Sequence, residues 1–340
     1  MKTFAWAPAR SLAEAAVAAS SLVADAMTAP AETDVSILKA GGVDVLDLMK
    51  EGLIAPARLV ALRDAPGLDA IEDGADGSLR IGAMATLSRL AEHAGGRARF
   101  PALIAAVASS ATPQIRNVAT LGGNLLQRPR CWYFRSAEFH CLRKGGGHCF
   151  AIPGDNRYHA IFDNRLCAVV HPSTAATALV ALGASLELVD AEGERREVRL
   201  EDFFVAPDRD VQRENDLRPH EILAAIKLPA LPASARMAHV KIAEKASFDW
   251  PLADVAALLD FSPDGRCASA SIVLGAAAPT PHRAKSAEGA LVGERIDENV
   301  ARAAGRAALD GAAPLAGNLY KLPLFETAVR RAILEAVAAG

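Results

Sequence analysis

Long apolar runs are missing from this chain of 340 residues. No uninterrupted apolar stretch approaches the roughly 20 residues that a membrane-spanning helix requires, so we expect no membrane insertion. An alanine- and valine-rich stretch at 13–19 is reminiscent of an export signal, but Glu14 and Asp25 interrupt it. Ser11 and Glu14 also have the spacing of a capping box. We therefore expect a helix here, and not a cleaved signal.

A strong charge of either sign is absent as well. The formal net charge is -3, with 37 Lys and Arg against 40 Asp and Glu. Such a balance offers no general attraction to nucleic acid. Cations and aromatic residues alternate between residues 128 and 144, and we expect these cations to offset the negative charge of a neighbouring site. With 51% hydrophobic residues the composition is globular, and the length favours two domains.

Several familiar catalytic motifs do not occur. The sequence contains no G-x-G-x-x-G dinucleotide fingerprint, no P-loop and no HExxH motif. No Ser-His-Asp or paired-carboxylate arrangement emerges either. Rossmann-type binding and hydrolytic chemistry are therefore disfavoured, and we assign no catalytic residue.

The hydrophobic pattern predicts an α+β fold, with a mixed N-terminal region and a C-terminal region of strands followed by helices. Proline-rich residues 229–233 separate the two regions. Residues 126–168 lack regular periodicity and form a predicted irregular insertion. The expected strands are 3–6, 35–38, 59–62, 78–81, 185–189, 197–200, 222–228, 237–242, 255–261 and 268–274, and the expected helices are 11–20, 44–50, 87–93, 102–110, 175–182, 284–291, 299–309 and 324–338.

Two glycine pairs are candidate binding motifs. The first, KAGGVD at 39–44, joins a predicted strand to a predicted helix, and the second, NVATLGGN at 117–124, places Thr120 and Asn124 beside its glycines. Glycines allow a ligand to approach the backbone, and N–H groups at a helix start suit phosphate. Ordinary tight turns are the alternative. Two such turns could hold the two ends of one diphosphate.

Four of the five cysteines fall in or beside the insertion, namely Cys131, Cys141, Cys149 and Cys167. Their clustering differs from the even spread of a disulfide scaffold. Thiolates ligate iron–sulfur clusters, so this set could hold a 4Fe-4S cluster. Structural zinc, which normally uses close C-x2-C pairs, and buried or disulfide-bonded cysteines are the alternatives. Cys267 is expected to be a core residue. Four histidines are expected to be hydrogen-bonded loop residues, namely His140, His148, His159 and His171.

The two glycine motifs, in this order, resemble the FAD-binding motifs of the flavoprotein subunits of the xanthine dehydrogenase and carbon monoxide dehydrogenase family. Residues 239–259 and 274–293 resemble later segments of the same family. Because of the cysteine-bearing insertion, the likeness is greatest to FAD subunits of bacterial periplasmic-type aldehyde oxidoreductases.

The resemblance implies a two-lobed FAD-binding domain of the PCMH (vanillyl-alcohol oxidase-like) type at 1–230. Its subdomains are expected at roughly 1–58 and 59–230, with the insertion at about 126–168. A C-terminal α+β domain of the CO dehydrogenase flavoprotein type is expected at 231–340.

The resemblance also implies which residues hold FAD. They are Lys39, Ala40, Gly41, Gly42, Val43, Asp44, Asn117, Thr120, Gly122, Gly123, Asn124 and Lys241, the last of these near the flavin ring. Two positions depart from the family pattern, because Val43 stands where the family usually has Thr and Thr174 where it usually has Asp. Each departure removes a polar group, so we expect altered FAD affinity or tuning.

The family resemblance implies an FAD-binding electron-transfer subunit of a heterotrimeric molybdenum-containing oxidoreductase. Its partners would be a small subunit with 2Fe-2S clusters and a large subunit with molybdopterin, and electrons would leave to an external acceptor. The complex would be cytoplasmic, or periplasmic by co-export with a signal-bearing partner. The alternatives are a flavoenzyme that oxidises its own substrate and a non-catalytic metal-bound scaffold without flavin.

Overall fold

The N-terminal lobe is built on a small parallel sheet. The computed structural model describes residues 2–29, 33–245 and 248–339. Its first three strands pair in the order β1-β3-β2. The elements of this lobe are β1 (Ala5–Pro8), α1 (Leu12–Ala18), α2 (Val23–Thr28), β2 (Ser36–Lys39), α3 (Val43–Lys50) and β3 (Arg58–Ala61). Strand β3 runs across the predicted subdomain boundary between residues 58 and 59.

The second lobe contains a five-stranded antiparallel sheet in the order β4-β5-β8-β6-β7. Its strands are β4 (Ile71–Asp73), β5 (Leu79–Gly82), β6 (Ser185–Val189), β7 (Arg195–Arg199) and β8 (Ile222–Leu228). Its helices are α4 (Leu87–Glu92), α5 (Ala94–Arg99), α6 (Pro101–Ala108), α7 (Pro113–Arg116), α8 (Leu121–Leu125), α10 (Thr174–Ala181) and α11 (Leu200–Phe203).

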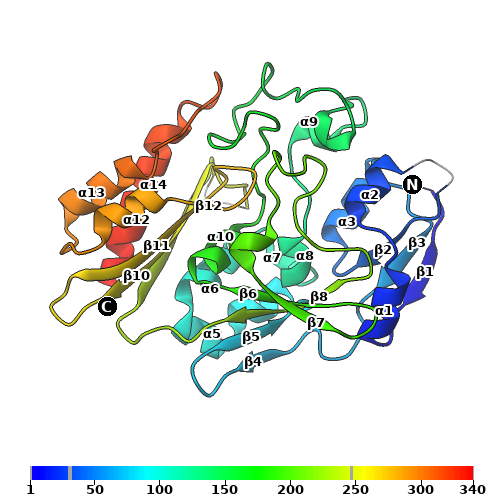
Figure 1. Ribbon diagram of the computed structural model, residues 1–340, viewed down its shortest axis with the longest axis horizontal. Coiled ribbons are helices and arrows are strands. Elements are labelled where there is room, and N and C mark those ends of the chain that lie inside the picture. The colour runs from blue at the N-terminus through cyan, green and yellow to red at the C-terminus, as the bar shows by residue number, and fades with distance from the viewer. Residues whose placement is uncertain (1, 30–32, 246–247, 340) are drawn as a thin grey trace.

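The C-terminal lobe follows after Leu228 and consists of a four-stranded antiparallel sheet with three helices (Figure 1). Its elements are β9 (Arg236–Ile242), β10 (Ala253–Phe261), β11 (Cys267–Gly275), β12 (His282–Arg283), α12 (Lys285–Leu291), α13 (Glu298–Ala307) and α14 (Lys321–Ala338). Val255, Ala257 and Leu259 alternate along β10 and pack into the core beneath these helices, whereas Ala256 joins the core of the second lobe. Because successive side chains of a strand point to opposite faces of the sheet, β10 contributes residues to both cores.

Helix α10 lies between the two larger sheets. All eight of its residues are buried, and it contacts α6 on one side and both β10 and β11 on another. A helix that is apolar all round is expected at such a place, because every face meets protein. This packing fixes the second lobe against the C-terminal lobe.

The insertion agrees with its predicted irregular character. It carries only the single turns α9 (Trp132–Arg135) and η1 (Leu142–Lys144) and otherwise lacks regular structure. Edge-on contacts among aromatic rings hold it together, including Tyr133 against Phe139 and Trp132 against His159.

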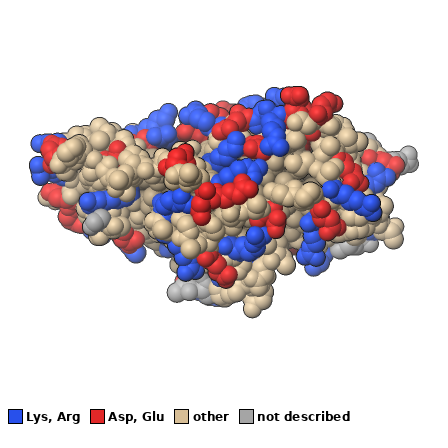
Figure 2. All heavy atoms as spheres, turned by 90° about the horizontal axis from the view of Figure 1, so that it is seen from below, with Lys and Arg blue, Asp and Glu red and all other residues tan. Residues whose placement is uncertain are grey.

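The surface carries charges of both signs side by side. On the face seen in Figure 2, Lys and Arg alternate with Asp and Glu over most of the visible area. This mixture matches the nearly balanced composition. Among the helices in the described ranges, none has the length and apolar character needed to cross a bilayer.

Lys321, the first residue of α14, joins the C-terminal lobe to the insertion. Its side chain is fully buried, and Nζ donates hydrogen bonds to the carbonyls of His159 at 3.0 Å and Ala276 at 2.5 Å. Burial lowers the pKa of this amine to about 7. The folded chain therefore releases a proton that the unfolded chain keeps up to about pH 10.

We predict that replacing Lys321 by Met removes a pH dependence of stability. In the native chain, the unfolded state binds the extra proton between about pH 7 and pH 10, so the free energy of unfolding rises with pH in this window and is flat below it. The contribution of Lys321 should be about 2 kcal/mol between pH 7 and pH 9. Urea unfolding at both pH values measures it, and an equal rise in both proteins would contradict the prediction.

Candidate functional site

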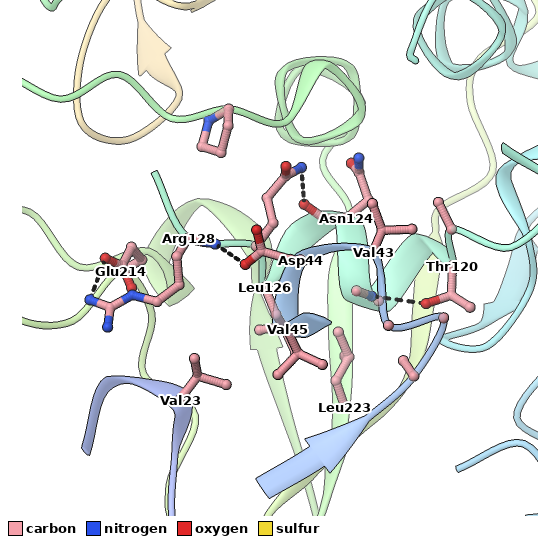
Figure 3. Close-up of a pocket in the computed structure, with 18 of the residues that line it drawn as sticks. Val23, Val43, Asp44, Val45, Thr120, Asn124, Leu126, Arg128, Glu214 and Leu223 are labelled. Carbon is pink, nitrogen blue, oxygen red and sulfur yellow. Dashed lines mark hydrogen bonds and ion pairs between the residues drawn. The ribbon is translucent and has the colours of Figure 1, made fainter. Parts of the chain in front are cut away.

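A cavity of about 490 Å³ lies where the three lobes meet. Its walls come from the loop between β2 and α3, the start of α8, strand β8, the segment 213–218 and Lys241 of β9. Figure 3 shows side chains of these segments arranged around it. A cavity of this size, assembled from several elements, is typical of a cofactor site.

The first glycine motif forms a turn that only glycine adopts readily. Gly42 is the N-cap of α3 and has a φ of 89°, in the left-handed region that disfavours residues with a Cβ. The first residues of α3, Val43 and Asp44, line the cavity, and their N–H groups lack partners within the helix. The positive end of the helix dipole adds to the attraction for a phosphate.

The second glycine motif lies against the first. A Cβ added to Gly41 would be 2.0 Å from the carbonyl oxygen of Val118, far inside van der Waals contact. The second motif differs from an open turn, because Gly122 and Gly123 belong to the first turn of α8. Thr120 caps this helix by accepting a hydrogen bond from the Gly123 N–H at 3.2 Å.

Asp44 is held by three arginines. Its Oδ1 accepts a hydrogen bond from Arg135 at 2.6 Å and forms an ion pair with Arg130 at 3.0 Å. Its Oδ2 accepts from the backbone N–H of Arg128 at 2.9 Å, as drawn in Figure 3. Both oxygens are thus engaged, so Asp44 ties the first glycine motif to the start of the insertion.

Most of the candidate binding residues line the cavity. These are Ala40, Gly41, Gly42, Val43, Asp44, Thr120, Gly122, Gly123, Asn124 and Lys241. Lys39 and Asn117 are not among the lining residues. The amine of Lys39 lies 5.3 Å from the ring centre of Trp6, while Asn117 caps α7 through its backbone N–H.

Lys241 places an amine at the cavity. Its Nζ donates to the carbonyl of Ser109 at 2.9 Å, and the side chain is half-buried. Burial lowers its pKa, although Asp254 and Asp249 act in the opposite direction. The amine can therefore present positive charge to a ligand.

The two departures from the family pattern also line the cavity. Val43 is the first residue of α3, and Thr174, the first of α10, is buried. Next to Thr174, the hydroxyl of Ser173 donates to the side-chain oxygen of Asn124 at 2.5 Å. The second glycine motif is thereby fastened to α10.

Sequence reasoning missed several residues that line the cavity: Arg213, Glu214, Asn215, Leu217 and Arg218, and Phe248 and Trp250 between β9 and β10. The segment 213–218 lies in an irregular, charged stretch between β7 and β8, and nothing in its pattern marks Glu214 as a partner of Arg128. Two of the insertion cations, Arg130 and Arg135, pair with the carboxylates of Asp44 and Asp47, and the expectation that cations here offset the charge of a neighbouring site stays a prediction.

The four clustered cysteines line a second, small cavity within the insertion. Cys131, Cys141, Cys149 and Cys167 all border it, together with Arg143 and His159. All five cysteines of the chain are free thiols, and Cys267 is buried on β11, as expected for a core residue. Within the described ranges, no three His, Cys, Asp or Glu side chains are grouped so as to hold a metal ion.

The cysteine cavity contains one thiol that ionises readily. A hydrogen bond from Cys149 and the adjacent guanidinium of Arg143 lower the pKa of Cys167, although burial opposes them. The same hydrogen bond, together with burial, raises the pKa of Cys149. Burial also raises the pKa of Cys131 to about 11.

Two of the four insertion histidines have defined surroundings. His159 Nε2 lies 3.2 Å from the sulfur of Cys131, and burial lowers its pKa to about 4. His171 is buried, and its Nδ1 accepts from the backbone N–H of Ser173 at 3.3 Å. Both are neutral near pH 7.

Two known protein families match most of the chain. The family described as FAD binding domain in molybdopterin dehydrogenase matches residues 2–231, and the CO dehydrogenase flavoprotein C-terminal domain matches residues 238–336. The aldehyde oxidoreductase FAD-binding subunit PaoB of Escherichia coli (strain K12) is 35% identical over 301 residues, covering 88% of this chain and 91% of PaoB.

Two carbon monoxide dehydrogenases are similar as well. The carbon monoxide dehydrogenase medium chain of Afipia carboxidovorans is 30% identical over 312 residues, covering 88% of each chain. A solved structure of reconstituted CO dehydrogenase from Oligotropha carboxidovorans matches with a TM-score of 0.75 at 26% identity, covering 100% of this chain and 99% of that chain.

We predict that Gly41→Ala weakens FAD binding about tenfold or more, equivalent to ~1.4 kcal/mol. The new Cβ would force the two glycine motifs apart, because the carbonyl of Val118 leaves no room for it. Flavin released per chain on denaturation measures the effect after dialysis. Gly289→Ala is the control, since no atom lies within 4 Å of its added Cβ. Equal flavin content in both variants would contradict the prediction.

Proposed function

The chain belongs to the family of FAD-binding subunits of molybdenum-containing dehydrogenases, and we propose that it holds FAD between its two glycine motifs as the electron-transfer subunit of such an enzyme. The observation that carries this proposal is the approach of Gly41 to the Val118 carbonyl at the wall of the cavity. This contact brings the amides of both motifs to one place, as a diphosphate requires.

Different groups of the chain would bind different parts of FAD. The N–H groups at the start of α3 are available for phosphate oxygens, and Thr120 and Asn124 hold the second motif in place. Lys241 offers positive charge from β9, which would favour negative charge on a bound ring. Bound FAD supplies a centre that accepts electrons singly and releases them singly or in pairs.

The four-cysteine cavity supports a second proposal, a 4Fe-4S cluster within the insertion. Four thiols border one cavity, and four thiolates are the usual ligand set of such clusters. Arg143 and Lys144 are buried nearby, and their charges would offset that of a thiolate-bound cluster.

The proposed partners are a small subunit with 2Fe-2S clusters and a large subunit with molybdopterin. Two relatives carry names that mark them as parts of larger enzymes. One is an aldehyde oxidoreductase FAD-binding subunit and the other is a carbon monoxide dehydrogenase medium chain. We assign substrate oxidation to the large subunit and electron delivery to an external acceptor to this chain. The complex would lie in the cytoplasm, or in the periplasm if a partner carries the export signal.

A complex purified without molybdenum separates this proposal from a flavoenzyme that oxidises its own substrate. Cells grown with tungstate would supply the metal-substituted complex. The probe is whichever of benzaldehyde and xanthine bleaches the flavin of the molybdenum-containing complex. We predict that the substituted complex keeps its flavin, that dithionite bleaches it, and that the probe does not.

The opposite result identifies the rival functions. Bleaching of the flavin by the probe without molybdenum would place substrate oxidation on this chain. A complex that releases no flavin when denatured would favour a scaffold. Either result contradicts the proposed electron-transfer role.

We predict that Cys131→Ser removes the insertion cluster but leaves the flavin. Cys131 borders the cysteine cavity and not the larger one, so the loss should be confined to iron, with about four irons fewer per complex. Metal analysis for iron and zinc measures it, and Cys267→Ser is the matched control on β11. Unchanged iron, or the loss of one zinc instead, would contradict the cluster.

A further inference from the structure

A buried group of three charges lies between the two cavities. Glu214 Oε1 accepts hydrogen bonds from Arg128 at 2.9 Å and from Arg143 at 2.6 Å. The side chains of Arg128 and Arg143 are only 3% and 1% exposed, and that of Glu214 is 9% exposed. Although burial works against it, the two arginines lower the pKa of Glu214, which keeps it ionised.

One end of this charge group reaches the larger cavity. Arg128 and Glu214 both line it, and Figure 3 shows the pair at one side of the site. The backbone N–H of Arg128 also holds Asp44 at 2.9 Å. The same arginine thus fixes the first glycine motif and pairs with Glu214.

The other end of the charge group reaches the cysteine cavity. Arg143 borders this cavity with all four cysteines, and its charge helps to lower the pKa of the Cys167 thiol. The carbonyls of Gln212 and Arg213 accept from Arg128 and Arg143 respectively. The segment around Glu214 therefore holds both arginines in one place.

Stability alone is a weak reason for this arrangement, because burying two cations with one anion carries a large desolvation cost. In a low dielectric, a buried charge acts on neighbouring centres more strongly than one in water. We propose that Arg128, Glu214 and Arg143 set the reduction potentials of both cavities together, with Glu214 as the positioning residue that joins them. The proposal rests on the function proposed above.

Glu214→Gln in the purified complex tests the inference. The change keeps the shape of the side chain but removes its charge, so two buried cations remain without an anion. Positive surroundings favour the reduced forms of a cluster and of a flavin, since reduction adds negative charge. We expect the potentials of the flavin and of the insertion cluster both to rise, as measured by a redox titration followed by visible and EPR spectra.

Arg143→Met tests the end of the group next to the cysteines. It leaves Arg128 and Glu214 as a balanced pair, so the fold should tolerate it better than an unpaired charge. We expect the cluster potential to fall and the flavin potential to change less. If Glu214→Gln does not accumulate, this variant decides: a lowered cluster potential together with a smaller shift of the flavin potential supports the inference, and a change confined to the cluster, or no change, overturns it.

Glu187→Gln is the matched control. Glu187 has the same 9% exposure as Glu214 and pairs with Arg80 at 3.2 Å and Lys227 at 3.3 Å, but it lines neither cavity. Both potentials should equal those of the native complex. The inference is overturned if Glu214→Gln behaves like this control, or moves only one potential.

Iron and flavin content separate this inference from the proposed function. A native complex without flavin would contradict the proposed function, and one without iron at the insertion would contradict the proposed cluster, whatever the potentials are. Full iron and flavin in Glu214→Gln, with both potentials at native values, would contradict the inference alone.

Discussion

The backbone of Gly41 touches the carbonyl of Val118 so closely that no side chain could stand between them. This contact joins two segments that lie far apart in the sequence, and the rest of the site is arranged around it. The first segment begins α3, and the second precedes α8, which packs on β8. The contact therefore sets the distance between the N-terminal lobe and the second lobe at the mouth of the cavity.

Charged side chains hold this junction from the other side. Asp44 follows the first glycine turn; it accepts hydrogen bonds from Arg128 and Arg135 of the insertion and forms an ion pair with Arg130. Ion pairs with this little exposure are directional and resist screening by salt. The insertion is thus more than an added loop, because it braces the turn on which phosphate binding depends. Its cysteine cavity and the larger cavity share the same framework of charges.

The regular strands of the larger sheets could be predicted well from the sequence. Strand β8 and strand β6 have the predicted bounds, because β8 is a short apolar run that ends before Pro229 and β6 ends before the turn at 190–193. The family resemblance, the α+β fold class and the assignment as an oxidoreductase subunit are confirmed. Strand bounds follow from local hydrophobic patterns, and the family follows from motifs that occur in a fixed order. Both can be read from a single sequence.

The contacts that complete the site join residues far apart in the sequence, so the sequence alone did not predict them. Glu214 lies in an irregular stretch, and its role arises only because two insertion arginines fold against it. Lys39 belongs to the first motif by sequence, yet its side chain lies over Trp6. Short elements such as β4 and α2 were also missed, because three to six residues carry too little periodicity.

An experimental structure of the complete enzyme would test the central claim most directly. The account predicts density for the FAD diphosphate between the amides of Gly41 and Gly42 and those of Gly122 and Gly123. Gly41 should remain against the Val118 carbonyl when FAD is bound. A diphosphate bound elsewhere in the chain, or a cavity filled by side chains of a partner subunit, would contradict it.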